Sequence, residues 1–169
     1  MKSFLSFVLS FCLTPFVFAQ SFVSTSAENK NTVLEEFTGI KCVYCPDGHL
    51  RAQNLYNANP NDVVLINLHV GGYAVPGAGE PDFRTSFGSA VSGQSTLSGY
   101  PAGTVNRHDF STNGWDQNGG TAMSRGNWTA AANVIMGESS PVNVANQTSL
   151  DLANGALSAV TEVYYTGNS

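Results

Sequence analysis

Residues 32–46, Thr-Val-Leu-Glu-Glu-Phe-Thr-Gly-Ile-Lys-Cys-Val-Tyr-Cys-Pro, decide the fold of this chain. The first seven of these residues are rich in apolar and β-favouring side chains, which is typical of a strand. Gly39 to Lys41 then makes a turn into the two cysteines, and Pro46 is tolerated in the first turn of a helix. We therefore predict a strand, a Cys-x-x-Cys pair at its end, and a helix that stops near Asn59-Pro60.

The position of the cysteines at a strand-to-helix junction points to redox chemistry. Cys42 would lie at the helix N-terminus with Lys41 alongside, and both neighbours favour a thiolate, so Cys42 is the candidate nucleophile. Cys45 is one helical turn further in and is the candidate resolving thiol. An inert disulfide and half of a zinc site are the alternatives. A c-type haem attachment site is excluded because Pro46, and not His, follows Cys45.

Two acidic residues lie on the strand that leads into the cysteines. Glu36 is six residues before Cys42, and a carboxylate held under the cysteines could take the proton of Cys45 while a mixed disulfide is resolved. Glu35 would then point to the opposite face of the strand. The alternative is that both are solvated acids on an edge strand. We take Glu36 as a candidate catalytic residue.

Tyr100-Pro101 is the second candidate part of the site. A cis bond before Pro101 would leave a backbone edge open to an extended substrate beside the cysteines. The preceding Gly99 and the strand that follows favour this cis form, and an ordinary trans turn proline is the alternative. We expect Pro101 to act with the cysteines, and Tyr100 and Lys41 to contact the substrate.

His49 is four residues beyond Cys45 and would share its helix face. With both cysteines and either His69 or His108, it could complete a zinc or copper site. We prefer the interpretation in which His49 is partly exposed and tunes the thiol. The sequence accordingly predicts no metal ion and no cofactor.

The N-terminus has the features of a secretory signal peptide. Lys2 is followed by an apolar stretch from Phe4 to Phe18, and we expect cleavage after Val17-Phe18-Ala19. Cys12 as a lipoprotein acceptor is the alternative, which the bulky Phe11 disfavours. Export would place the chain in the periplasm or at the outer membrane.

Loss of the signal peptide leaves two cysteines in an oxidising compartment, as a disulfide or a cycling dithiol. Their ring is so small that it adds little stability, which favours a chemical role. The net charge of −5 becomes −6 without Lys2, and basic residues do not cluster, so nucleic acid is disfavoured as a partner. No further apolar stretch reaches membrane-spanning length, which predicts a soluble or peripheral mature chain.

The rest of the first domain is predicted in outline. Four consecutive apolar residues within Val63–Val70 predict a strand that is buried on both faces. Residues 71–99 form a long insertion with a helix near 85–92, and such insertions commonly carry substrate-facing surface. A strand over 103–107 and a last helix over 123–136 complete the pattern.

The tail of the chain has a different pattern. Residues 142–152 and 156–166 alternate between apolar and polar side chains around a turn at Ala153-Asn154-Gly155, which predicts a hairpin. Because two strands cannot bury a core of their own, we expect the chain to stop inside a second, all-β domain. The expected division is a signal peptide over 1–19, an α/β domain over 28–138, a linker over 139–141, and the start of a β-sandwich domain over 142–169.

The strand, the Cys-x-x-Cys, the helix and the later proline resemble the thioredoxin superfamily. More specifically, residues 35–49, 66–74, 82–85 and 99–107 are similar to the 28-kilodalton-type outer membrane proteins of Gram-negative bacteria. This resemblance implies a thioredoxin-like fold with an insertion before the cis-proline strand, followed by a β-sandwich. It also implies catalytic and resolving roles for Cys42 and Cys45, the cis-proline role for Pro101, and the buried-acid position for Glu36.

Two functions follow as hypotheses. The first is an exported thiol–disulfide oxidoreductase domain whose partners are protein thiols and disulfides. The second is a surface binding or structural module that keeps the scaffold without the chemistry and binds through Tyr73, Phe83 and Phe87. A zinc- or copper-carrying role that needs His49 is a third interpretation.

Overall fold

The computed structural model describes residues 21–167, so the predicted signal peptide and Cys12 lie outside the described residues. Its strands are β1 (Thr32–Thr38), β2 (Val63–His69), β3 (Ala102–Val105), β4 (Met123–Ser124), β5 (Val142–Asp151) and β6 (Ala156–Tyr165). Its helices are α1 (Cys45–Ala58), α2 (Ser86–Gln94) and α3 (Trp128–Met136), with short 3-10 turns at Gly72–Ala74 and Ser111–Asn113.

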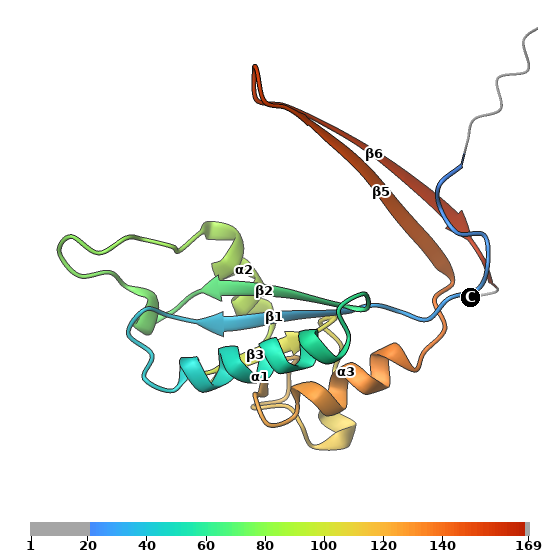
Figure 1. Ribbon diagram of the computed structural model, residues 1–169. Coiled ribbons are helices and arrows are strands. Elements are labelled where there is room, and N and C mark those ends of the chain that lie inside the picture. The colour runs from blue at the N-terminus through green and yellow to red at the C-terminus, as the bar shows by residue number, and fades with distance from the viewer. Residues whose placement is uncertain (1–20, 168–169) are drawn as a thin grey trace, which may run out of the picture.

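Strands β1 to β4 form one mixed sheet in the order β2-β1-β3-β4 (Figure 1). The central strand β1 runs parallel to β2, with Thr32 opposite Val63, and antiparallel to β3, with Leu34 opposite Val105. Helix α1 connects the two parallel strands, so the Cys-x-x-Cys lies at the first junction of a βαβ unit. This topology is α/β, as predicted, and it is compatible with a thioredoxin-like fold.

The two faces of the sheet bury two separate apolar clusters, because successive side chains of a strand point to opposite faces. Leu34 of β1 packs with residues of α1 and α3, including Leu55 and Trp128, on one face. Phe37 of β1 packs with Val70 and Ala102 on the other face, where α2 contributes the half-buried Val91. The central strand is therefore covered on both sides near the cysteines.

The prediction that Val63–Val70 is buried on both faces is wrong. Strand β2 lies at the edge of the sheet, and Val64 and Ile66 keep 50% and 39% of their surface exposed. Val63 points to the opposite face and is buried. The nine-residue helix α2 is too short to cover the whole face that Val64 shares, so an apolar run here does not mean a covered strand.

The predicted last helix over 123–136 is also too long. Met123 and Ser124 pair with β3 as the short strand β4, and the helix begins only at Trp128. The Met123 side chain projects from β4 into the cluster around Trp128 and is fully buried there. The predicted helix near 85–92 is present as α2, where the Thr85 hydroxyl caps the helix by accepting from the Gly88 N–H at 3.0 Å.

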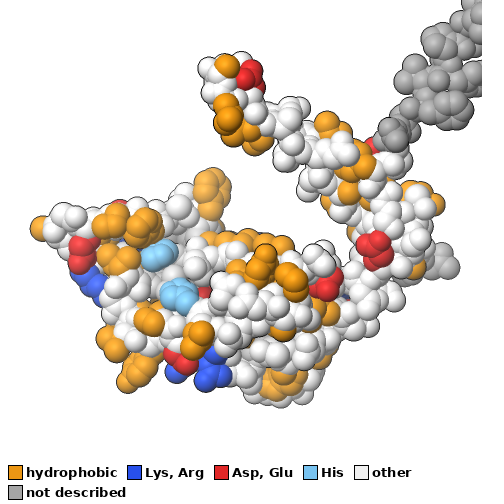
Figure 2. All heavy atoms as spheres, viewed as in Figure 1, with side chains coloured by type: hydrophobic (Ala, Val, Ile, Leu, Met, Phe, Trp, Pro, Cys, Tyr) orange, Lys and Arg blue, Asp and Glu red, His pale blue; other side chains and the backbone are white. Residues whose placement is uncertain are grey.

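Strands β5 and β6 form a separate two-stranded hairpin that projects from the end of α3 (Figure 1). Their register places Val144 opposite Val163 and Leu150 opposite Leu157 on one face of the hairpin. These four side chains keep between 52% and 68% of their surface exposed. Hydrophobic side chains accordingly lie at the surface along the hairpin in Figure 2.

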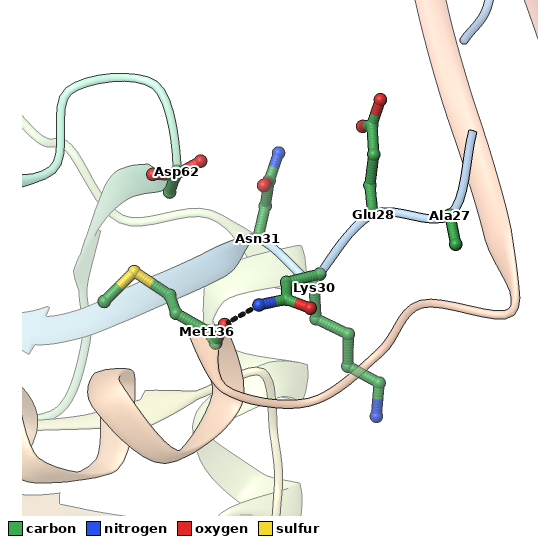
Figure 3. A pocket seen from close by; sticks show the side chains of 7 residues that line it. Ala27, Glu28, Lys30, Asn31, Asp62 and Met136 are labelled. Carbon is green, nitrogen blue, oxygen red and sulfur yellow. Dashed lines mark hydrogen bonds between the residues drawn. The ribbon is translucent and has the colours of Figure 1, made fainter. Parts of the chain in front are cut away.

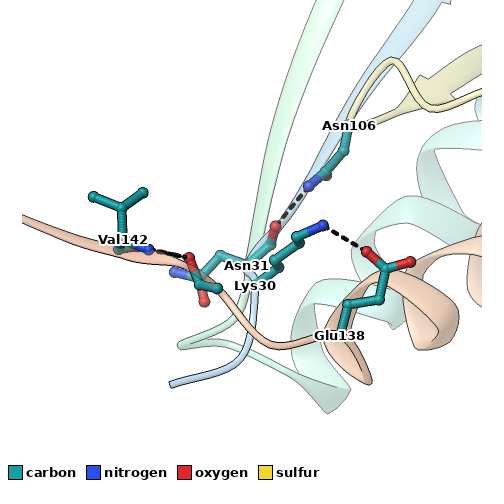
Figure 4. Close-up of polar contacts among 6 residues, drawn as sticks. Lys30, Asn31, Asn106, Glu138 and Val142 are labelled. Carbon is teal, nitrogen blue, oxygen red and sulfur yellow. Dashed lines mark hydrogen bonds and ion pairs between the residues drawn. The ribbon is translucent and has the colours of Figure 1, made fainter. Parts of the chain in front are cut away.

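The segment before β1 is tied to the loop after β3 and to the segment after α3 by polar contacts (Figure 4). Lys30 forms an ion pair with Glu138 at 2.6 Å, and the Asn106 side chain donates to the Asn31 carbonyl at 2.9 Å. Further along, the Asn143 side chain donates to the carbonyls of Ser24 and Ser26. The hairpin is thus anchored to the described N-terminal residues by hydrogen bonds, and neither apolar cluster of the four-stranded sheet includes a hairpin residue. Among the described helices, none combines the length and apolar character that a membrane crossing requires.

Candidate redox site

Cys42 and Cys45 are joined as a disulfide, with their Cα atoms 5.3 Å apart. Helix α1 begins at Cys45, and Pro46 lies in its first turn as predicted. Cys42 therefore lies on the turn before the helix, where its carbonyl accepts from the Cys45 N–H at 3.2 Å. Both residues are largely buried, but Cys42 at 8% exposure is more accessible than Cys45 at 1%. An incoming sulfur would accordingly reach Cys42 first.

Cys42 opens into an aromatic groove, which we define by its lining residues and which has a volume of about 410 Å³. The lining residues are Cys42, Val43, Tyr44, Tyr73, Ser98, Gly99 and Tyr100. Tyr73 and Tyr100 meet edge to face with ring centroids 5.4 Å apart, and the Tyr100 hydroxyl donates to the Val70 carbonyl at 3.2 Å. Burial, together with the neighbouring Tyr73, raises the pKa of Tyr100. The groove is therefore apolar and carries no charged side chain among the residues that line it.

The loop before Cys42 is held against the insertion that supplies Tyr73. The Lys41 N–H donates to the Tyr73 carbonyl at 3.0 Å. A Cβ atom on Gly39 would lie 2.5 Å from the same carbonyl oxygen, so only glycine permits this approach. The Lys41 ammonium lies 3.6 Å from Glu80, which means that its charge is shared with a carboxylate of the insertion and is not directed at Cys42 alone.

Pro101 is buried, and the bond between Tyr100 and Pro101 is cis, as predicted. Pro101 packs directly against helix α1. A Cβ atom on Gly48 would lie 2.9 Å from Pro101 Cβ and 2.6 Å from Glu36 Oε1, closer than real contacts allow. Gly48 thus lets the helix, the proline and the acid approach one another under the cysteines.

Glu36 is 1% exposed and points toward α1. Its Oε2 lies 3.0 Å from His49 Nδ1, while His49 Nε2 lies 3.4 Å from the Thr38 hydroxyl. The other oxygen, Oε1, is buried and has no hydrogen-bond partner among the described atoms. Burial raises the pKa of Glu36, and the nearby His49 partly opposes this shift. A buried carboxyl with one free oxygen is suited to accept a proton.

The alternative that Glu35 and Glu36 are solvated acids on an edge strand is wrong. Strand β1 is central, and Glu35 lies on the opposite face from Glu36, 7% exposed. Arg107 binds both Glu35 oxygens, at 2.6 and 2.8 Å. Glu35 is thus a structural ion-pair partner, and Glu36 alone faces the cysteine-bearing helix.

The residues of the metal hypothesis are not brought together. His69 lies at the end of β2 with its ring 5.0 Å from that of Phe83, and His108 packs on Phe110. Burial and the proximity of His49 lower the pKa of His69. Across residues 21–167, the structure groups no three His, Cys, Asp or Glu side chains so that they could hold a metal ion. Phe87 is 83% exposed and lies away from the groove lining, as does Phe83.

Two features of the site were not predicted from the sequence, the role of Gly48 and the pairing of Glu36 with His49. Gly48 carries a signal, since a glycine inside a helical pattern costs about 1 kcal/mol relative to alanine and so suggests a packing reason. The pairing had no such signal, because Glu36 and His49 come from different elements and meet only through the helix-on-sheet packing.

A second cavity, of about 480 Å³, contains no cysteine (Figure 3). It is lined by residues 27–31, Asp62 and Met136, and the Asn29 side chain donates to the Met136 carbonyl at 2.9 Å. Residues 27–31 precede β1, Asp62 precedes β2 and Met136 ends α3, whereas the cysteines follow β1. The cavity is therefore at the opposite end of the parallel strands from the disulfide.

No family model matches this chain, and no curated protein matches it. Among solved structures, the chain is similar to HBP35 of Porphyromonas gingivalis, with 21% sequence identity and a TM-score of 0.49. That similarity covers 73% of this chain and 38% of the HBP35 chain, so this chain spans well under half of its length. The compatibility with a thioredoxin-like fold rests on the sheet order, the βαβ unit and the cysteines at its first junction.

Proposed function

We propose that this chain carries a thiol–disulfide oxidoreductase domain that uses Cys42 and Cys45. The observation that carries the proposal is the disulfide at the start of α1, with the more accessible sulfur at the aromatic groove and the buried one on the helix that packs on Glu36. A merely structural staple would need neither an open groove nor a buried carboxyl with a free oxygen.

The proposed reaction has two exchange steps. The Cys42 thiolate attacks a substrate disulfide, forms a mixed disulfide and releases the first substrate thiolate. Cys45 then loses its proton to Glu36 and attacks the Cys42 sulfur, which breaks the mixed disulfide and releases the second substrate thiolate. The substrate gains two electrons and the protein returns to the Cys42–Cys45 disulfide. Oxidation of a substrate dithiol is the reverse of these steps.

The proposed substrate is a polypeptide whose cysteine has apolar or aromatic neighbours. Tyr44 and Tyr73 are 67% and 52% exposed beside Cys42, and Val43 is 84% exposed. Covering these side chains with apolar substrate residues would remove them from water. Lys41 and Tyr100 would position the substrate at the edges of this contact, and Pro101 would act beneath it as packing for α1.

Turnover of a protein disulfide tests the proposal. Wild-type protein with a thiol reductant should accelerate reduction of a disulfide-bonded test protein, and Cys42→Ser should abolish the acceleration because no nucleophile remains. Ser149→Ala, an exposed residue of β5 outside the groove, should retain the wild-type rate. Equal rates for wild type and Cys42→Ser would contradict the enzymatic role.

A non-catalytic binding module is the second candidate, and the exposed tyrosines of the groove favour it. Binding of an aromatic-rich peptide should then persist in Cys42→Ser and be lost in Tyr73→Ala. Under the oxidoreductase proposal, stable capture depends on Cys42 itself. The two variants therefore separate the hypotheses.

We also propose that the chain is exported and associates with the outer membrane, as the 28-kilodalton-type proteins do. The support is the sequence of residues 1–19 and the similarity of residues 35–49 to that family. Mass spectrometry of the protein from fractionated cells should find a mature chain that starts at Gln20 in the envelope. An uncleaved chain in the cytoplasm would contradict export.

A further inference from the structure

Because Cys45 is buried, its thiol cannot release a proton directly to water. The residue is 1% exposed, and Glu36, the group proposed to take its proton, is also 1% exposed. A proton that moves from Cys45 to Glu36 is still inside the protein, and Glu36 must lose it before the next cycle. The resolving step therefore needs a route from Glu36 to water.

His49 is the side chain that connects Glu36 with solvent. Its Nδ1 is 3.0 Å from Glu36 Oε2, and its side chain is 41% exposed, whereas that of Glu36 is 2% exposed. Cys45, Gly48 and His49 share one face of α1 because residues three and four apart on a helix are neighbours. With no Cβ at Gly48, Glu36 Oε1 reaches this face of α1, where a Cβ atom would lie 2.6 Å from it.

We propose that His49 relays the Cys45 proton between Glu36 and water. This proposal rests on the thiol–disulfide exchange proposed above and assigns the proton path of its second step. The Glu36–His49 pair takes the proton of Cys45 Sγ on Oε1 and returns one proton to water from the exposed imidazole. One proton enters and one leaves, and the electrons move only between sulfurs. His49 is a positioning residue that acts through Glu36, not a group that touches the reacting sulfur.

The charged surroundings of His49 come from three elements. Glu36 faces it from β1, and His69 approaches from the end of β2, close enough that the two rings influence each other. Histidine side chains, pale blue in Figure 2, lie near one another on the face that it shows. On α1 itself, Asp47 is paired with Arg51 and with Arg125. Glu36 is thus the carboxylate in direct contact with the ring, at 3.0 Å.

Single-turnover reaction of the reduced protein with glutathione disulfide tests the relay. Acid quenching and mass spectrometry would follow formation of the glutathione adduct on Cys42 and its decay to the Cys42–Cys45 disulfide. His49→Gln keeps polar atoms but cannot titrate, so adduct formation should stay within about twofold of wild type, while adduct decay at pH 7 should slow by about tenfold. His108→Gln, which changes an exposed histidine in the loop after β3, should alter neither step.

Two further measurements separate a relay from a structural role. Imidazole added to His49→Ala should accelerate adduct decay at least about threefold, since a soluble base can occupy the exposed position. In a Glu36→Gln background, His49→Gln should slow decay no further, because His49 acts through Glu36. Adduct decay at the wild-type rate in His49→Gln, or failure of imidazole to accelerate His49→Ala, would overturn the relay alone. Absence of any adduct in wild type would instead overturn the proposed function.

Discussion

Gly48 is the residue on which the close packing of the site depends. It lies inside α1, where alanine would normally be preferred by about 1 kcal/mol. Its missing side chain leaves room for the Glu36 carboxyl and for Pro101, both of which would be closer than 3 Å to a Cβ atom. The site thus uses a weak helix former in order to bring an acid and a proline beneath the cysteines.

Gly48→Ala should destabilise the oxidised protein by about 1–3 kcal/mol, because overpacking of the Glu36 and Pro101 contacts outweighs the gain in helix propensity. Gly93→Ala in α2 is the matched control, since a Cβ atom there meets nothing within 4 Å. It should be neutral or stabilise by up to about 1 kcal/mol. Urea unfolding of both variants checks this prediction, and a Gly48→Ala protein as stable as Gly93→Ala would contradict the packing described.

Glu36 also makes stability depend on pH. Burial raises its pKa above the ordinary value of 4.5. At a pH between 4.5 and this raised pKa, the folded protein keeps on Glu36 a proton that the unfolded chain has lost. The free energy of unfolding should therefore fall as the pH rises through this window. Glu36→Gln removes this titration, so the free energy of unfolding of the variant should rise relative to that of the wild type as the pH increases. The exposed Glu28→Gln is the control, and parallel stability curves for wild type and Glu36→Gln from pH 4.5 to 8 would refute the assignment.

At the scale of elements, the edge position of β2 produces neighbouring valines with opposite environments. Val63 is 3% exposed in the cluster beneath α1 and α3, and Val64 is 50% exposed on the other face. Val63→Ala should cost about 2 kcal/mol, from lost transfer free energy and a residual cavity. Val64→Ala should cost less than about 1 kcal/mol. Chemical denaturation of the two variants decides the matter, and equal losses would show that β2 is covered on both faces.

The strand and the helix that flank the cysteines could be predicted from the sequence, because the residues that mark their boundaries are local signals. The β-favouring run of residues 32–38, the tolerated Pro46 and the turn at Asn59-Pro60 each mark a boundary without reference to the rest of the chain. The burial of β2 could not be predicted in this way, since an apolar run does not report whether a helix covers it. Strand β4 was not predicted for a different reason, because its two residues, Met123 and Ser124, are too few to form a periodic pattern.

For the whole molecule, the hairpin β5–β6 is an amphipathic ribbon outside the two apolar clusters. Its pairing was predictable from alternation and from the turn at Asn154-Gly155, where Gly155 has a φ of +73°. The proposal that it begins a larger β domain, with a boundary near Pro141, is supported by the exposure of Val144 and Leu157. Hydrogen bonds from Phe22 and Val23 to Glu162 tie it to the described N-terminal residues.

Deletion of residues 140–169 should leave the melting transition of residues 28–138 nearly unchanged, because neither cluster loses a member. Solubility should improve, since the apolar face and unpaired edges of the hairpin are removed. Scanning calorimetry and sedimentation of the full and shortened chains measure both effects. A fall of many degrees in the melting temperature would show that the hairpin belongs to the first domain.

The central claim is that Cys42 exchanges disulfides and Cys45 resolves them, and trapping the intermediate tests it most directly. Purified, reduced Cys45→Ala would be mixed with a disulfide-linked peptide that has an aromatic residue beside its cysteine. We predict a stable one-to-one adduct between Cys45→Ala and the peptide, attached at Cys42. The double variant Cys42→Ser/Cys45→Ala should form no adduct. In the wild-type protein the adduct should form and then decay to the Cys42–Cys45 disulfide. An adduct that never forms on Cys42, or one that persists in wild type as it does in Cys45→Ala, would contradict the account.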